Sequence, residues 1–248
     1  MRFSDTFKER EKDFRSVLKD KSIVGIRLDG KAFHTFTKQF DKPYDHKFMV
    51  GMDAAATYVV ERVFPNALLA YVQSDEISII FTDRTSENGQ FPLGGRVEKI
   101  LSIASSAASV GLIKCLPEAQ GHPIFDARLF YLENVEEIHD YITWRRLDAR
   151  KNGISMAAEC VKSHKELIGT PTEGRLKLLE GTPFERLPEG FMNGRFIVKE
   201  NFQEEVSYVD KRTNETNFIL ADRHRWINVP AHKEEVDKVV SKIRLLDA

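Results

Sequence analysis

Short β-branched runs and longer amphipathic stretches alternate along the chain. Residues 22–28, "SIVGIRL", are rich in Ile and Val and predict a strand that ends on Asp29 and Gly30. The apolar runs at 67–73 ("ALLAYVQ") and 77–81 ("ISIIF") flank a Ser-Asp-Glu sequence and predict a β-hairpin with a tight polar turn. A further strand is predicted at 126–132, "DARLFYL".

Helical patterns separate these strands. Residues 4–20 predict a helix, because Ser4 can cap it and its apolar side chains fall near one face. A long helix is predicted to begin at Asn134, with Glu137 three residues later in the spacing of a capping box. Further helices are predicted at residues 46–63, 96–114, 170–181 and 232–246.

The order of elements predicts an α+β fold built on a ferredoxin-like βαββαβ unit. Nucleotide-polymerising palm domains share this unit, as do many unrelated proteins, so the fold alone does not define a function. We expect a palm-like catalytic core at residues 1–135 and an extension of helices and a small β-ribbon at 136–248, packed on the core as one unit. The ribbon is predicted from the segments at 194–200, 204–209 and 217–222.

Composition narrows the class of protein. The chain has 248 residues, of which 42% are hydrophobic, and its formal net charge is −1. An RNA contact would therefore need a local basic surface. Two widely separated cysteines argue against a disulfide scaffold or a zinc site. The N-terminal stretch is charged, and no apolar run approaches the roughly 20 residues that span a membrane. We expect a cytoplasmic protein with no membrane partner.

Acidic side chains stand where two predicted strands meet. If the strand after the first helix pairs beside the first strand, Asp29 and Asp75 lie close together at one end of the sheet. Two unpaired carboxylates would repel each other unless a divalent cation lies between them, and Mg²⁺ is commonly held by one or two carboxylates and substrate phosphates. Two such ions can catalyse phosphoryl transfer. The alternative is that Asp75 and Glu76 are ordinary turn residues.

The residues after Asp29 have the composition of a phosphate-binding loop. Gly30 lets a ligand approach the backbone closely. Successive backbone N–H groups of a helical turn that follows can bind a triphosphate, with lysines to balance its charge. The residues concerned are Lys31, Ala32, Phe33 and His34 in the loop, and Lys31, Lys42 and Lys99 as the cations. Each lysine is also compatible with an ordinary surface position.

Several of these motifs resemble the tRNA-His guanylyltransferase family. They are "RLDGKAFHTF" (27–36), "FDKPYD" (40–45), "YVQSDEISIIF" (71–81) and "TWRRLDARKN" (143–152). The first and third, in this order and at this separation, are highly specific. The resemblance also covers 95–109, 174–182 and 187–198, so that it extends over about residues 20 to 200.

This resemblance implies an enzyme that adds nucleotides to the 5′ end of tRNA. ATP adenylylates a 5′ monophosphate, and the 3′ hydroxyl of an incoming nucleoside triphosphate, mainly GTP, attacks the activated end. The family's pattern places two Mg²⁺ ions on Asp29, Asp75 and the carbonyl of Gly30. It also implies a homotetramer, a dimer of dimers.

Further roles follow from the same resemblance. The triphosphate is held by the loop from Asp29 to His34, with Ser74 and Asp75 beside it, and His34 lies near the activation step. Lys42 and Lys99 match lysines near the phosphates. Arg27 matches an arginine near the site, and we expect it to contact tRNA. Glu76 matches a catalytic-site acid in a supporting role.

One departure bears on the substrate. After the aspartate that matches Asp148, family members specific for tRNA-His carry HINNLYN, whereas this chain has "RKNGISM", which keeps only Asn152. The family histidine is linked to addition of the extra guanosine on tRNA-His, and Arg150 replaces it. The sequence therefore resembles the branch that repairs 5′-truncated tRNA by template-dependent 3′-to-5′ polymerisation. Lys31 and Ala32 also replace an Arg and an Asn common in the family.

A basic cluster on the predicted long helix is a candidate tRNA surface. Arg146 and Arg150 share a helical face, with Arg145 close to it and Lys151 and Asn152 following. Such a cluster can track phosphates, or it can be an ordinary solvated face.

Two other functions fit a palm-like sheet with an acidic turn. One is a nucleotide cyclase or dinucleotide synthase, although Gln73-Ser74 stand where a diguanylate cyclase would carry a glycine pair. The other is a non-catalytic nucleotide-binding or RNA-binding module, against which the intact Asp29, Gly30 and Asp75 argue.

Overall fold

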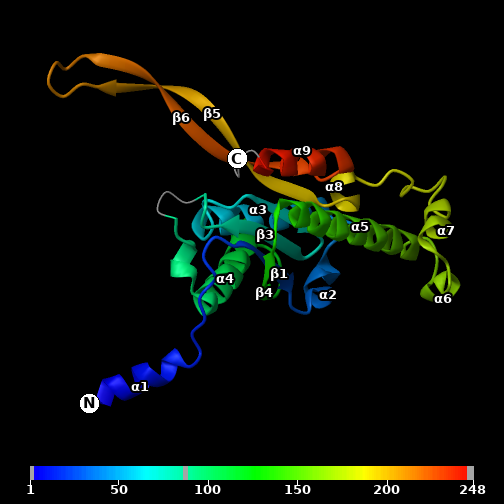
Figure 1. Ribbon diagram of the computed structural model, residues 1–248. Helices are drawn as coiled ribbons and strands as arrows, with labels where there is room; N and C mark the ends of the chain where they lie inside the picture. Colours follow the sequence, from blue (N-terminus) through cyan, green and yellow to red (C-terminus); the bar gives the residue numbers. More distant parts are fainter. Residues whose placement is uncertain (1–2, 86–88, 245–248) are drawn as a thin grey trace.

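One antiparallel sheet lies at the centre of the molecule (Figure 1). A computed structural model describes residues 3–85 and 89–244. In the described chain the strands follow the order β4-β1-β3-β2-β5-β6. They are β1 (Ile23–Gly30), β2 (Leu69–Gln73), β3 (Glu76–Thr82), β4 (Phe125–Leu132), β5 (Arg195–Val209) and β6 (Thr216–Pro230).

Helices cover both faces of this sheet. The longer ones are α3 (His46–Arg62), α4 (Val97–Cys115), α5 (Val135–Glu159) and α9 (Lys233–Arg244). The shorter ones are α1 (Phe3–Lys12), α2 (Phe33–Phe36), α6 (His164–Leu167), α7 (Thr172–Lys177) and α8 (Glu189–Met192), with 3₁₀ turns at Thr37–Gln39 and Pro92–Gly95. No helix among the described residues is long and apolar enough to cross a membrane.

The α+β fold with a ferredoxin-like βαββαβ unit is confirmed. Its elements are β1, α3, β2, β3, α4 and β4, and its strands follow the order β4-β1-β3-β2. The expectation that the strand after the first helix pairs with the first strand is wrong, because β3 and not β2 pairs with β1. After the hairpin turn, β3 lies between β1 and β2 in the sheet. The turn still lies at the end of β1, so the expected meeting of Asp29 and Asp75 survives this correction.

Each face of the sheet has its own apolar core. Alternate β1 residues Val24, Ile26 and Leu28 pack with α3 and α4. Tyr71 and Phe196 lie on the opposite face, with residues of α5 and α9. Every residue of β2 and β3 is buried, which explains why these strands read as continuous apolar runs.

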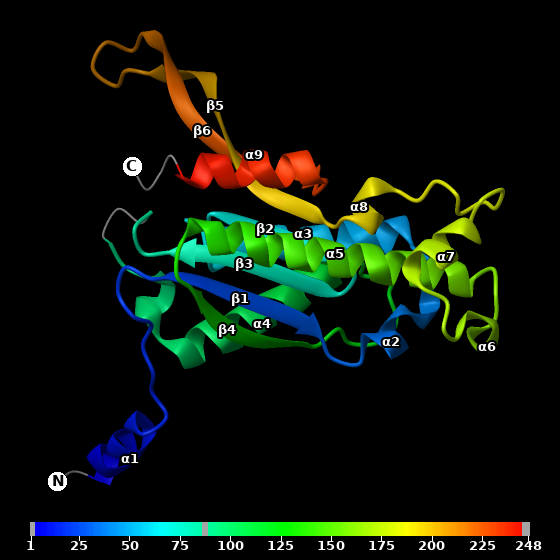
Figure 2. The same ribbon diagram turned by 45° about the vertical axis from the view of Figure 1, so that its right-hand side comes forward.

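The N-terminal helix is shorter than predicted. α1 ends at Lys12 instead of residue 20, and Phe14 is 85% exposed. The chain then runs extended, because Leu18 N–H donates to Gly95 O (2.9 Å) and Val97 N–H donates to Ser16 O (2.9 Å). This pairing with the segment before α4 replaces the last helical turns. α1 itself lies away from the body of the molecule (Figures 1 and 2).

The C-terminal ribbon is larger than predicted. β5 and β6 contain 15 residues each and pair along their whole length. The first residues of β5 also pair with β2, so the extension and the core share one sheet. The far half of the ribbon projects from the body (Figure 2). Residues 245–246 of the predicted last helix lie outside the described residues. So do residues 86–88 of the segment 82–95, whose polar and glycine-containing sequence predicts a loop.

Candidate active site

Asp29 and Asp75 lie at the same end of the sheet. Asp29 is the penultimate residue of β1 and stands opposite Glu76 in the register with β3. Asp75 occupies the two-residue turn between β2 and β3, and its carbonyl accepts a hydrogen bond from Gly30 N–H (3.1 Å). Both acids line a cavity of about 400 Å³ between this turn, α5 and α8.

The electrostatic environment of Asp75 is unfavourable for its charge. Burial raises the pKa of the Asp75 carboxyl, and the negative charges of Asp29 and Glu76 raise it further, against opposing hydrogen bonds from Ser74 and its own backbone. Within the described chain, neither Asp29 nor Asp75 forms an ion pair with a lysine or arginine. Two adjacent carboxylates without a counter-charge are a binding site for a cation.

The donor set fits Mg²⁺ held partly by substrate. The available protein ligands are two carboxylates and the Gly30 carbonyl. No group of three or more His, Cys, Asp or Glu side chains suited to a metal occurs within the described ranges. Mg²⁺ typically takes one or two carboxylates and completes its shell with water and phosphate oxygens. The site is therefore compatible with Mg²⁺–nucleotide, and the ligand roles of Asp29, Gly30 and Asp75 stay predictions.

Glu76 is engaged in a buried ion pair. Its carboxylate accepts hydrogen bonds from Arg145 Nε (2.8 Å) and Nη2 (2.6 Å), and each residue is 7% exposed. Arg27 Nε lies 3.9 Å from the same carboxylate. The sequence predicts Arg145 near an RNA-binding face, but it lies inside, bidentate to Glu76. The pair joins α5 to the strand that carries the turn, which supports a positioning role for Glu76.

Two backbone N–H groups of the predicted phosphate loop already form hydrogen bonds within the protein. Gly30 N–H bonds to Asp75, and Lys31 N–H donates to Ile124 O (2.8 Å). Only the N–H groups of Ala32, Phe33 and His34, at the start of α2, are left for a phosphate. A Cβ atom on Gly30 would lie 2.4 Å from the Phe33 ring. Gly30 is therefore needed for close packing of Phe33, a reason that the sequence did not reveal.

Lys42 and Lys99 lie in different parts of the structure. Lys42 is exposed and lines a small cavity, of about 70 Å³, together with Ser74. Lys99 lies in the first turn of α4, next to the segment that leads into the start of β1. That is the opposite end of the sheet from Asp29. The structure therefore does not bring Lys99 to the acids within one chain, because α4 begins where β3 ends.

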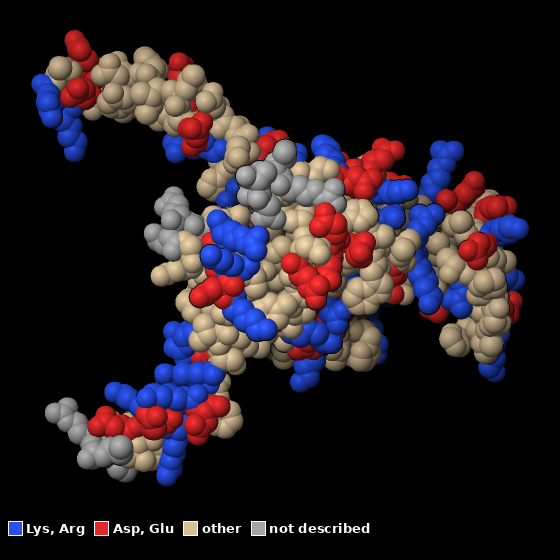
Figure 3. Space-filling view, in the orientation of Figure 1, with Lys and Arg blue, Asp and Glu red and all other residues tan. Residues whose placement is uncertain are grey.

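The basic residues of α5 also differ in their exposure to solvent. Arg146 is half-buried, and its Nη1 donates to Asn193 Oδ1 (3.1 Å). Arg150, Lys151 and Asn152 are exposed, and Asn152 lines the same cavity as Asp29 and Asp75. Figure 3 shows basic and acidic side chains interspersed over one face of the body. Of the basic side chains in this cluster, Arg150 and Lys151 are therefore the ones open to an RNA phosphate.

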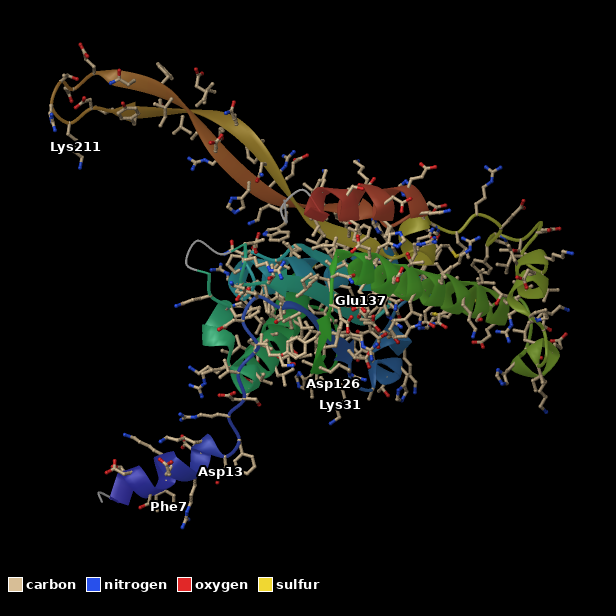
Figure 4. The ribbon with its side chains drawn as sticks, in the orientation of Figure 1. Phe7, Asp13, Lys31, Asp126, Glu137 and Lys211 are labelled. Carbon is tan, nitrogen blue, oxygen red and sulfur yellow. The ribbon has the colours of Figure 1, made fainter. Side chains whose placement is uncertain are left out.

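Sequence reasoning missed two residues near the site. Asp126 stands opposite Asp29 on β4, and it lies beside Lys31 at the end of the sheet (Figure 4). Its only sequence signal was an acid at the start of a predicted strand. Phe191 of α8 lines the cavity and contacts the Tyr44 ring, with centroids 5.3 Å apart. No local pattern connects a residue of α8 with a loop almost 150 positions earlier.

The chain is similar to proteins of known family. The sequence profile described as tRNAHis guanylyltransferase matches residues 4–133 of the 248. A probable tRNA(His) guanylyltransferase of Drosophila melanogaster is 29% identical over 240 residues, covering 88% of this chain and 76% of the relative. The tRNA(His) guanylyltransferase of Candida glabrata is 28% identical over 227 residues, covering 82% of this chain and 94% of the relative.

Solved structures give the same result. A bacterial tRNA(His) guanylyltransferase-like protein in complex with ATP superimposes with a TM-score of 0.77 at 27% identity, covering 97% of this chain and 95% of that one. A structure of such a protein in complex with GTP gives 0.74 at 27% identity, covering 96% and 98%. The resemblance found in the motifs is confirmed: the chain belongs to the tRNAHis guanylyltransferase family of nucleotidyltransferases.

Proposed function

We propose that this protein is a metal-dependent 3′-to-5′ nucleotidyltransferase that repairs 5′-truncated tRNA. It activates the RNA 5′ end with ATP and then adds nucleotides, mainly from GTP, opposite a template base. The observation that carries the proposal is the uncompensated pair Asp29 and Asp75, which line one cavity. The ATP and GTP complexes of the bacterial guanylyltransferase-like proteins support nucleotides as the substrates.

Asp29, Asp75 and the Gly30 carbonyl would hold two Mg²⁺ ions in this enzyme. Bound Mg²⁺ supplies charge stabilisation at the phosphoryl oxygens. The chain contributes orientation: the Glu76–Arg145 pair fixes the turn that carries Asp75. Exposed His34 follows the free N–H groups of the loop, and we assign it to the activation step, with Lys42 and Ser74 beside the phosphates.

Repair is favoured over addition of the extra guanosine because Arg150 replaces the histidine linked to that addition. Asn152, which keeps its family position, faces the cavity with the acids. Addition of the extra 5′ guanosine to tRNA-His remains the alternative, since the curated relatives bear that name. We further expect a cytoplasmic homotetramer with tRNA as its partner.

The test uses a tRNA that lacks its first nucleotide and carries a 5′ monophosphate. The protein is incubated with this RNA, ATP, Mg²⁺ and each nucleoside triphosphate, and product length is read on a sequencing gel. Repair predicts addition of the nucleotide complementary to the opposing base, whichever base is placed there. Guanosine added to tRNA-His regardless of template would support the alternative, and a cyclic dinucleotide product would indicate a cyclase.

In the same assay, variants test whether the two acids of the site are needed for the chemistry. Asp29→Ala and Asp75→Ala should each abolish both adenylylation and transfer. Asp140→Asn removes an exposed acid from the first turns of α5 and should leave both steps unchanged. Full activity in either of the first two variants would exclude the two-metal site.

A further inference from the structure

An exposed aromatic side chain stands next to the candidate active site. Trp144 of α5 is 54% exposed, and Leu147, one turn later, is 53% exposed. The neighbour of Trp144 in the chain is Arg145, whose guanidinium holds Glu76. Tryptophan is mostly buried in folded proteins. A half-exposed ring one residue from the ion pair that fixes the catalytic turn therefore needs an explanation.

The ring of Trp144 is held in one orientation. Tyr141 meets it edge-on, with ring centroids 5.9 Å apart, and Tyr141 is itself fixed by a hydrogen bond to Ser78 (2.8 Å) and by the Phe130 ring (4.6 Å). The guanidinium carbon of Arg145 lies 4.6 Å from the centre of the Trp144 ring. Packing and a cation–π contact thus orient the indole without covering it.

Two arginines lie on the same side of the sheet as the catalytic acids. Arg27 on β1 and Arg128 on β4 stand directly opposite each other in the register. Such like charges repel, and each has an acidic neighbour, Glu76 at 3.9 Å and Asp126 at 3.0 Å. Figure 2 shows β1 and β4 below α5. The side chain of Arg128 is 54% exposed and that of Arg27 is 21% exposed. Trp144, Arg128 and Arg27 thus form a partly exposed shelf beside α5.

We propose that Trp144 stacks on an unpaired nucleobase of the RNA strand beside the 5′ end, while Arg27 and Arg128 contact its backbone phosphate. The inference rests on the proposed function, since it assumes an RNA substrate. Aromatic rings beside guanidinium groups are the usual means of binding single-stranded nucleic acid. Stacking would hold the strand that carries the template base while the 5′ end enters the cavity.

An RNA strand fits this shelf better than a free nucleoside triphosphate. Each arginine already has a carboxylate neighbour, so the two pairs carry no net charge. Glu76 and Asp126 would repel a phosphodiester, with its one negative charge, less strongly than a triphosphate.

The chain contains only two tryptophans, Trp144 and Trp226, so fluorescence can report on one of them. In a Trp226→Phe protein, the emission comes from Trp144 alone. We would titrate this protein with two RNA hairpins, each with a 5′ monophosphate, one blunt and one with an unpaired nucleotide opposite the missing 5′ position. Stacking predicts quenching by the second hairpin and binding about tenfold tighter than to the blunt one.

Variants with Trp226 intact test the same preference by filter binding. Trp144→Ala should lose the preference for the unpaired nucleotide, Trp144→Phe should keep part of it, and Leu147→Ala should keep it whole. Unchanged Trp144 emission in the RNA complex, no RNA binding, or equal quenching by GTP alone would overturn the proposal. A change in Trp144 emission with protein concentration would also overturn the proposal if the sedimentation coefficient changed in parallel. That result would indicate that Trp144 contacts a second copy of the chain.

Nucleotide addition to the same hairpins separates this proposal from the proposed function. Quenching without nucleotide addition would keep the stacking role and reject the repair activity. Addition without quenching would keep the activity and reject the role of Trp144.

Discussion

Two half-buried acids, Asp75 and Asp53, have opposite surroundings. Burial raises the pKa of both carboxyls. Asp53, on α3, accepts a hydrogen bond from Arg195 Nε (2.6 Å) and another from Asn228 Nδ2. Asp75, at the hairpin turn, faces Asp29 and has no described cation beside it. Burial alone therefore does not distinguish the two carboxylates; the counter-charge does.

The difference separates a structural acid from a candidate catalytic one. Arg195 also donates to the carbonyls of Gly190 (2.9 Å) and Met49 (3.4 Å). Asp53 and Arg195 thus tie α3 to α8 and the root of the ribbon, and every strong charge in that cluster is balanced. The charge of Asp75 is left for a ligand to balance. The unbalanced charge of Asp75 destabilises the folded protein when no ligand is bound. The same charge attracts a ligand that can balance it.

The largest effect is expected at the balanced pair. Arg195→Ala leaves the half-buried Asp53 without its cation, which should lower the free energy of unfolding by about 3–5 kcal/mol. Urea denaturation followed by circular dichroism measures this. Arg62→Ala, at an exposed arginine on the same helix, should change it by less than about 0.5 kcal/mol. A loss below about 1 kcal/mol at Arg195 would contradict the structural role.

Neutralising the two acids should have opposite signs. Asp75→Asn removes an unfavourable charge and should stabilise the metal-free protein at pH 7 by about 0.5–2 kcal/mol. Asp53→Asn weakens the pairing with Arg195 and should destabilise it. The measurement is the urea midpoint of each variant and the wild type at pH 7, and a destabilised Asp75→Asn would contradict the account of the turn.

The effect of Asp75→Asn should depend on pH. A carboxyl whose pKa is raised in the folded state binds its proton more tightly folded than unfolded. Stability is then fully present below the unfolded pKa of about 4 and falls as the pH rises toward the folded pKa. The advantage of the Asn variant should therefore vanish near pH 3 and grow above pH 4. An advantage independent of pH would exclude a charge effect.

RNA binding should change modestly with the exposed cations of α5. Replacing Arg150 and Lys151 by Ala should lower the slope of log K against log salt by about 0.7–0.9 for each phosphate that these side chains neutralise. Fluorescence anisotropy with labelled tRNA at several salt concentrations measures it. Lys177→Ala, in the exposed last turn of α7, is the matched control. An unchanged slope would remove this surface from the RNA interface.

The smallest expected effect on stability comes from backbone strain, which is found at two residues of the candidate site. Ser74 and Ala32, on either side of the acids, have φ values of 45° and 56°, a region that Ala tolerates poorly and Asn more readily. Ala32→Asn should raise the free energy of unfolding by about 0.5 kcal/mol. Ala119→Asn, at a position without positive φ, should not. Equal effects at both positions would exclude relief of strain.

Local pattern predicted the parts of the site that lie within one strand or turn. β1, the hairpin and α3 followed from β-branched runs and helical periodicity. The approach of Asp29 to Asp75 was expected from a pairing of β2 with β1 that is wrong, and it holds because the hairpin turn lies at the end of β1. The pairing of Glu76 with Arg145 spans 69 positions, and the position of Asp126 depends on strand register. Neither leaves a periodic signal. Leu18 falls in the predicted helix because its pairing partner, Gly95, lies far along the chain.

The most direct test of the central claim is the stoichiometry of metal binding at the two acids. Mn²⁺ in place of Mg²⁺ can be followed by electron paramagnetic resonance in the presence of a non-hydrolysable GTP analogue. The account predicts two bound ions per chain in the wild type and in Asp140→Asn, and loss of at least one in Asp29→Asn and in Asp75→Asn. Two ions bound with wild-type affinity in both of these variants would contradict it.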